Sequence, residues 1–155
     1  MSIPASLSDR LHTQHLSLQT LLKGLDNDRL EFPVIAGKWS IRDNIAHLTR
    51  YQPLFMNRIQ SIVTGNEPVF ESYRAENDPE FELWLKKNTA ALIQELNADR
   101  KTLTDLLNQL NEKELTRYGI HPKFGRLSVL DWTEFFLLHE AHHLFTIFRL
   151  AHTPV

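Results

Sequence analysis

Apolar residues recur with the spacing of an α-helix in four long stretches, and this periodicity limits the possible folds more than any other feature. The stretches cover residues 6–25, 40–63, 79–110 and 128–150. The chain has only five glycines, and its strand-like runs are too short to build a sheet. We therefore predict an all-α protein, and a four-helix bundle is the natural way for these helices to bury their apolar faces.

Capping signals mark the start of three of these helices. Ser40 and Ser128 are each followed three positions later by an acidic residue, Asp43 and Asp131, a spacing close to that of a capping box. Asp78 is predicted to cap the third helix, which then continues without a break. We expect these caps to set where each helix begins.

The predicted connections between the helices are long. Residues 26–39 contain Pro33 and Gly37, and residues 117–126 form a turn-rich crossover. Long loops in a compact domain often carry functional residues, so these segments are candidates for ligand contacts.

Composition narrows the classes of function. A chain of 155 residues fits one domain, so residues 1–155 are predicted to form a single bundle. The formal net charge of −2 provides no basic field for nucleic acid or an anionic membrane. Because cysteine is absent, any metal site has to use histidine, aspartate or glutamate. The sequence shows neither a signal peptide nor a membrane-spanning run, which predicts a cytoplasmic protein.

The stretch "LLHEAHHLF", residues 137–145, is rich in histidine. His139 and His143 lie one helical turn apart on the apolar face, whereas His142 is rotated toward solvent and is a weaker candidate ligand. His47, at the border of the apolar face of another helix, can supply a third ligand. Three histidines with one open coordination position are typical of a catalytic metal site. Spacing alone leaves open whether these histidines bind a metal or are hydrogen-bonded core residues.

The same stretch matches the H-E-x-x-H pattern of zinc proteases, with Glu140 as its glutamate. Such a protease needs a further ligand downstream, but no Asp or Glu follows His143 and Arg149 stands six positions after it. No sheet is predicted to align a peptide, so we exclude a protease. Glu140 is then a partner of a metal ligand, a general base with a raised pKa, or a carboxylate on the helix surface or at a dimer interface.

A substrate pocket is predicted next to the histidines. Tyr51 and Arg58 share the helical stripe of His47, and Arg58 is suited to binding a substrate carboxylate or orienting a thiol. A solvated or salt-bridged Arg58 is the alternative. His121, in the crossover, either approaches the mouth of this pocket or makes a turn.

Two blocks of sequence together resemble the DinB/YfiT-like superfamily. In "GKWSIRDNIAHL" a Trp-Ser pair precedes a helix and a histidine follows, and "HPKFGRLSVLDWTEFFLLHEAHHLFTI" joins a His-Pro loop to a His-x-x-His-His run. Their order and separation match as well. The resemblance implies a four-helix bundle, often a homodimer, in which His47, His139 and His143 hold one divalent metal ion, most often nickel or zinc. It also implies metal-dependent transfer of a low-molecular-weight thiol such as bacillithiol, or related hydrolase or isomerase chemistry.

Two positions depart from the pattern of the family. Thr146 stands where relatives often carry Gln or His, and Leu138 stands where YfiT-like proteins can carry Trp. Both changes alter the wall of the pocket, so the metal is predicted more firmly than the substrate. We predict a metal-dependent thiol S-transferase or hydrolase that acts on a small molecule. The alternative is a non-enzymatic, stress-related binding protein on the same bundle, with no metal or a structural one.

Overall fold

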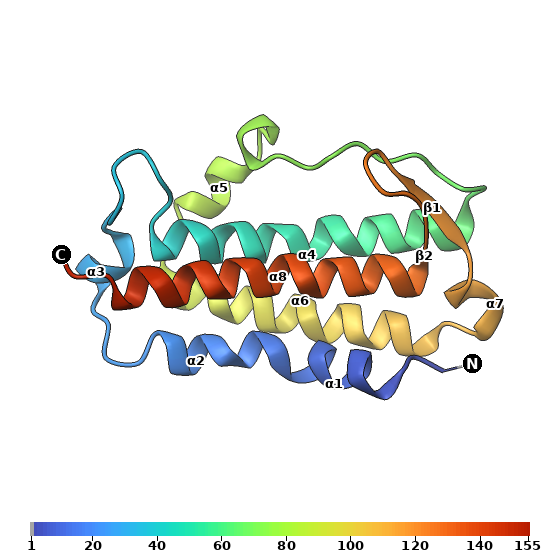
Figure 1. The fold of residues 1–155 in the computed structure, drawn as a ribbon, viewed down its shortest axis with the longest axis horizontal. Coiled ribbons are helices and arrows are strands. Elements are labelled where there is room, and N and C mark those ends of the chain that lie inside the picture. The colour runs from blue at the N-terminus through green and yellow to red at the C-terminus, as the bar shows by residue number, and fades with distance from the viewer. Residues whose placement is uncertain (1) are drawn as a thin grey trace.

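The computed structural model describes residues 2–155, which form a bundle of long helices packed side by side (Figure 1). The elements are α1 (Ala5–Thr13), η1 (Gln14–Leu16), α2 (Ser17–Leu21), α3 (Asn27–Glu31), α4 (Ile41–Thr64), η2 (Ala75–Asn77), α5 (Phe81–Leu85), α6 (Thr89–Gln109), α7 (Glu112–Leu115), β1 (Tyr118–His121), β2 (Gly125–Ser128) and α8 (Val129–His152). Helix α4 packs against both α6 and α8, and the α1–α2 segment forms the fourth side. The predicted four-helix bundle is confirmed.

None of the helices within residues 2–155 has the length and apolarity needed to cross a membrane.

The two helices that carry the candidate ligands begin where the sequence predicts. The Ser40 hydroxyl accepts a hydrogen bond from the Asp43 backbone N–H (3.1 Å), and the Asp43 carboxylate accepts one from the Ser40 N–H (2.9 Å). Ser128 and Asp131 make the same reciprocal box at the start of α8 (3.1 and 3.0 Å). A capping box satisfies N–H groups that a helix end leaves unpaired, so it anchors the start of each helix at a defined residue.

The prediction of one unbroken helix over residues 79–110 is wrong. The chain forms α5, leaves the helix, and restarts at α6, where the Asn88 side chain accepts a hydrogen bond from a backbone N–H in the first turn (2.8 Å). Asparagine favours such a cap over a helix interior, which explains the break. Asp78, the predicted cap, accepts a hydrogen bond from the Glu80 backbone N–H just before α5 (3.0 Å), and also from Arg50 (2.7 Å) and the Tyr73 hydroxyl (3.0 Å).

The first helix also differs from its prediction. Its helical path is interrupted by η1 and ends with α2, short of residue 25, and the chain then turns at Gly24 with a φ of +81°. That left-handed conformation favours glycine. Part of the predicted loop 26–39 forms α3, which Asp26 caps by accepting a hydrogen bond from the Arg29 N–H (2.8 Å).

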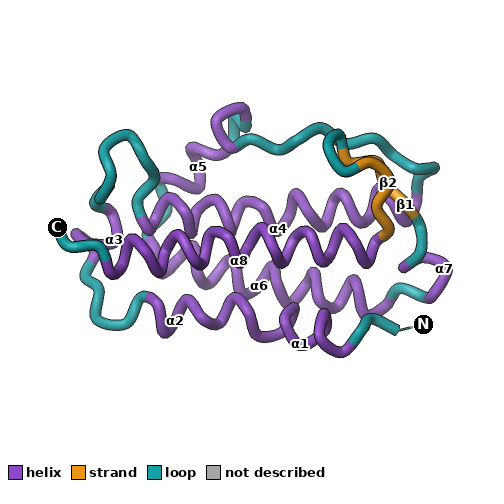
Figure 2. Tube along the Cα trace, in the orientation of Figure 1, coloured by secondary structure: helices purple, strands orange, loops and turns teal. Residues whose placement is uncertain are grey.

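A small sheet forms where the sequence predicts only a turn-rich crossover. Strands β1 and β2 pair as an antiparallel hairpin, and Gly125 begins β2 with a φ of +73°. The segment after α4 joins its edge, because the Phe70 N–H donates to the Ile120 carbonyl (3.0 Å) and the Ile120 N–H donates to the Pro68 carbonyl (2.8 Å). The prediction of no sheet is therefore wrong at this end of the bundle, where the loop leading to α5 starts its path along α4 (Figure 2).

A buried ion pair crosses the core between α6 and α8. Arg100 and Glu140 are each 1% exposed, and the guanidinium donates directly to the carboxylate. Gln14 donates to the other Glu140 oxygen (2.9 Å), while Arg100 also donates to Gln52 (3.1 Å) and to Nδ1 of His15 (3.2 Å). A charge this deeply buried is tolerated only with such partners. A helix-surface or dimer-interface position for Glu140 is therefore wrong.

Replacing one partner of this pair is expected to destabilise the fold strongly. Arg100→Met leaves the Glu140 carboxylate buried and unpaired, which should lower the free energy of unfolding by about 3–5 kcal/mol. The double variant Arg100→Met/Glu140→Leu removes both charges and should recover most of that loss. Urea unfolding followed by circular dichroism measures all three proteins. Lys101→Met, which breaks an exposed ion pair on the same helix, is the control, and an equally small effect of Arg100→Met would contradict the prediction.

Candidate metal centre

Three histidines from two helices converge in the middle of the bundle. His47 comes from α4, whereas His139 and His143 lie one turn apart on α8. One ring nitrogen of each lies within 4.8 Å of the others, and Nε2 of His47 is 3.0 Å from Nε2 of His139. Two nitrogens that each bind one ion at about 2.1 Å can be at most about 4.2 Å apart. The spacing of His47 and His139 is therefore one that a single ion can bridge.

Burial keeps these imidazoles uncharged. Removal from water first, and the neighbouring histidines second, lower the pKa of His47 to about 2, that of His143 to about 3 and that of His139 to about 4. A neutral imidazole retains the lone pair that metal binding requires. Three neutral imidazoles are the type of ligand that nitrogen-preferring divalent ions bind.

Asn44 sets the orientation of His143. The Asn44 side-chain amide donates to the Ser40 carbonyl (2.8 Å), so its oxygen faces Nδ1 of His143 at 2.9 Å. That oxygen can only accept, which places the proton of His143 on Nδ1 and leaves its Nε2 lone pair free. By contrast, Nδ1 of His47 and Nδ1 of His139 are buried without a hydrogen-bond partner among residues 2–155. His143 is therefore the candidate ligand whose ring is oriented by a hydrogen bond at Nδ1.

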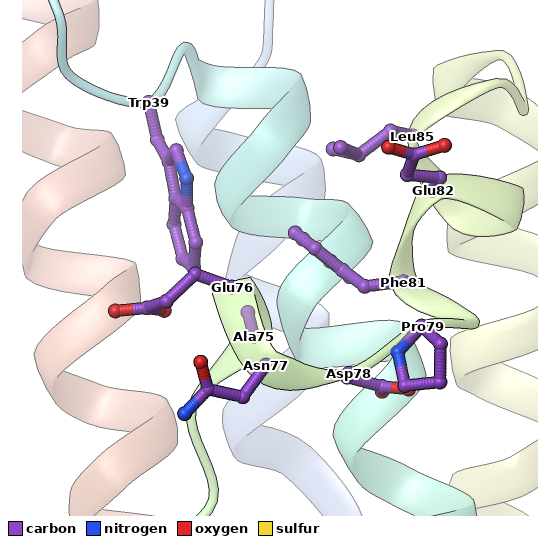
Figure 3. A pocket seen from close by; sticks show the side chains of 9 residues that line it. All are labelled: Trp39, Ala75, Glu76, Asn77, Asp78, Pro79, Phe81, Glu82 and Leu85. Carbon is purple, nitrogen blue, oxygen red and sulfur yellow. The ribbon is translucent and has the colours of Figure 1, made fainter.

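Aromatic side chains from four segments surround the histidines. The rings of Trp39 and Tyr73 lie 5.0 and 5.7 Å from that of His47, and the Tyr51 ring lies 4.6 Å from that of His139. Trp39 and Phe81 point from opposite sides into a cavity of about 650 Å³ next to the cluster (Figure 3). These rings keep water away from most of the cluster, which is the physical origin of the low pKa values.

A second cavity reaches the cluster directly. It has a volume of about 390 Å³ and is lined in part by Trp39, Asn44, His142 and His143. His142 is exposed, as the helical spacing predicts, and its ring lies 5.3 Å from that of His143. A small molecule that enters here meets His143 first.

The predicted substrate residues are only partly brought together. Arg58 donates to the Tyr51 hydroxyl (3.3 Å), so these two side chains are neighbours beside His139. His121 makes a turn, because its Nδ1 accepts hydrogen bonds from the backbone N–H groups of Lys123 (3.0 Å) and Phe124 (3.1 Å). Burial and then the charge of Arg58 lower the pKa of His121, so the hairpin lies within the electrostatic reach of Arg58.

Glu140 faces a different part of the molecule from its neighbour His139. Successive residues of a helix are rotated by about 100°. His139 therefore points toward α4, while Glu140 points toward α6 and η1. Both Glu140 oxygens are occupied, one by Arg100 and one by Gln14. Glu140 therefore pairs with Arg100 in the core and makes no hydrogen bond to the histidines.

A sequence model of the DinB superfamily matches residues 10–147, nearly the whole chain. This chain belongs to the DinB superfamily. YuaE of Bacillus subtilis (strain 168) is 27% identical over 135 residues, which cover 79% of this chain and 83% of YuaE.

Among solved structures, YfiT from Bacillus subtilis is similar with a TM-score of 0.79 and 17% identity, covering 94% of this chain and 84% of YfiT. YfiT is described as a probable metal-dependent hydrolase with an unusual four-helix bundle topology. At this level of identity, the similarity shows that the DinB-superfamily chain shares the fold of YfiT.

Two residues that contact the histidines of this DinB-superfamily chain were not predicted from the sequence. Asn44 precedes His47 by three positions, so helical spacing already places the two on one side of α4. That spacing was a usable signal. Tyr73 lies in the irregular segment between α4 and η2, and its contact with His47 depends on tertiary structure alone.

Removing the amide of Asn44 is expected to weaken metal binding. Asn44→Ala frees the ring of His143, so the affinity for zinc or nickel should fall about 10- to 100-fold, whereas Asn44→Asp keeps an acceptor for Nδ1 and should bind well. Competition with a chromophoric chelator measures these affinities. Thr49→Val is the control, because it removes a buried hydroxyl group of α4 that makes no hydrogen bond to the histidines. Equal affinities for Asn44→Ala and wild type would rule out this role of Asn44.

Proposed function

We propose that this DinB-superfamily chain is a metal-dependent enzyme that binds one divalent ion, nickel or zinc, through His47, His139 and His143. The observation that carries the proposal is the convergence of three neutral imidazole nitrogens, within 4.8 Å of one another, on two long helices. A divalent ion bound there would lower the pKa of a coordinated thiol or water toward neutral pH. The resemblance to DinB/YfiT-like proteins and the description of YfiT both support this proposal.

The reaction that we propose is transfer of a low-molecular-weight thiol to a small electrophile. The thiolate sulfur forms a bond to an electrophilic carbon of the acceptor, and the leaving group departs with the electrons of the bond that breaks. The thiol has to be a substrate, because the chain contains no cysteine. If water takes the place of the thiol, the same site hydrolyses its substrate, which is the class of reaction named for YfiT.

The surrounding side chains have distinct roles in this proposal. Asn44 holds His143 in one orientation, as its two hydrogen bonds require. Tyr51 and Arg58 form the substrate-facing wall beside His139, and His121 supports the hairpin that closes this wall. These three residues are the proposed substrate pocket.

Glu140 takes no part in the chemistry that we propose. A general base has to come within hydrogen-bond reach of the proton that it removes. To do so, Glu140 would have to break its buried ion pair with Arg100 and turn around α8.

We also propose that the active form is a homodimer. Three large apolar side chains on the outer face of α8 are exposed by 44–59%, namely Leu138, Phe145 and Phe148. Covering them with a second copy would remove this apolar surface from water, and a homodimer is also what the resemblance to the family implies. Light scattering after size-exclusion chromatography should give twice the mass of one chain, and a mass of one chain would contradict the dimer.

Metal analysis of protein purified without a histidine tag tests the proposal first. We expect about one equivalent of metal per chain after supply of zinc or nickel. His143→Ala should lose this metal while the helical circular dichroism signal is retained, and His12→Ala, at an exposed histidine of α1, should keep it. Strongly substoichiometric wild-type metal would contradict the metal site, and loss of the helical signal in His143→Ala would mean that the site is structural.

Thiol conjugation tests the reaction itself. Metal-loaded wild type should accelerate consumption of a low-molecular-weight thiol by a panel of electrophiles, and chelation or His143→Ala should abolish the acceleration. Mass spectrometry of the conjugates distinguishes S-transfer from hydrolysis of the electrophile. If metal-loaded protein accelerates neither reaction, the non-enzymatic binding protein becomes the better interpretation.

A further inference from the structure

Trp39 covers the histidine cluster without being tied to any polar group. Its ring lies 5.0 Å from that of His47 and 6.1 Å from that of His143, and it packs on the ring of Phe81 at 5.6 Å. The side chain is half-buried. Among residues 2–155, its indole N–H has no hydrogen-bond partner and no cation lies over its ring. Apolar and ring contacts alone hold it over the cluster.

The other aromatic rings around the cluster are held more firmly. The Tyr73 hydroxyl donates to the Asp78 carboxylate (3.0 Å), and the Tyr51 hydroxyl accepts a hydrogen bond from Arg58 (3.3 Å). Phe81 belongs to α5 and is 5% exposed. Moving one of these rings breaks a hydrogen bond or uncovers a buried side chain. The indole beside them is therefore the ring that can move at the lowest cost.

The segment that carries Trp39 is attached to the bundle by apolar contacts alone. Residues 33–39 have no helix or strand, and they lie in the loop that stands out between α3 and α4 (Figure 1). Within the described chain, the hydrogen bond that this segment makes is a turn of its own, from the Lys38 N–H to the Ile35 carbonyl (3.0 Å). Val34 and Trp39 pack against the core. The segment can thus shift without breaking a hydrogen bond to α4 or α8.

Trp39 also stands between two cavities. It lines both the cavity of about 650 Å³ beside Phe81 (Figure 3) and the cavity of about 390 Å³ beside His143, and it is the residue that the two linings share. Neither lining includes His47 or His139. A ligand in either cavity therefore meets the indole before it meets these two histidines. Displacing this one ring would join the cavities over the cluster.

We infer that Trp39 is a movable cover, whose ring swings away from His47 and admits small ligands to the histidine cluster. This role goes beyond the proposed function, because it concerns access to the cluster whether or not a metal is bound. Opening exposes one half-buried ring to water and breaks no hydrogen bond, so the open form is a minor state that is reached without unfolding. When the ring returns, it shields the bound ligand from water.

Chemical modification of the metal-free protein tests the cover. Diethylpyrocarbonate acylates accessible neutral imidazoles, and mass spectrometry gives the rate at His47, which is 5% exposed when the cover is closed. Trp39→Ala should raise this rate at least about 10-fold, because the opening step is no longer needed. Trp84→Ala removes another half-buried tryptophan and should leave the rate unchanged, so it is the matched control. The exposed His12 reports the activity of the reagent in every sample.

The urea dependence of the same rate identifies the motion that admits the reagent. The swing of one ring exposes little surface, so the rate at His47 in the wild type should stay nearly constant below the unfolding transition. A rate that rises steeply with urea would mean that the histidines are reached only through global unfolding, which would overturn the inference. An unchanged rate in Trp39→Ala would overturn it as well.

Metal exchange gives a second readout, which depends on the proposed function. Trp39 supplies no metal ligand, so Trp39→Ala should speed zinc loading and zinc release to excess chelator by the same factor, about 10-fold, and leave the affinity unchanged. A lower affinity with an unchanged loading rate would mean that the indole stabilises the bound ion, and the cover would be wrong. A protein that binds no zinc would contradict the proposed metal site, whereas the modification of His47 still decides whether Trp39 is a cover.

Discussion

The close packing of α4 against α8 is the constraint on which the rest of the structure depends. It brings His47 to face His139 with their Nε2 atoms 3.0 Å apart. A shift of one residue in either helix would turn the imidazole by about 100° and separate the pair. The two capping boxes, at Ser40 and Ser128, set where these helices begin and therefore which residues they turn toward each other. Local chemistry at the helix starts thus determines whether the histidines meet.

Helix α8 separates two buried polar clusters that avoid the cost of burial in different ways. On one side, His139 and its partners are buried in the uncharged form, since removal from water lowers their pKa values. On the other side, Glu140 is paired with Arg100 and hydrogen-bonded to Gln14. Because the charged groups are already satisfied, the histidine cluster can accept an ion without disturbing the ion pair. The ion pair in turn links α8 to α6 behind the site.

The sequence predicted those parts that depend on local signals. Capping residues and helical spacing identified α4 and α8, and the inward pair His139 and His143 followed from the same periodicity. The break before α6 was missed because apolar periodicity continues on both sides, and only the capping chemistry of Asn88 marks it. Tyr73 could not be placed, since its segment is held over the site by the ion pair of Asp78 and by pairing with β1. Such contacts join residues far apart in the chain and have no local pattern.

The charges around the cluster determine which ligands it can hold. Three neutral imidazoles leave the double charge of a bound ion uncompensated, unlike a site with carboxylate ligands. The nearby cation Arg58 adds to this positive potential, and the acidic neighbour Asp78 is already paired with Arg50. Burial is the main cause of the low pKa of His139, and the nearby charges of His142 and Arg58 contribute to it. A divalent ion held by these three histidines would therefore be best compensated by an anionic ligand.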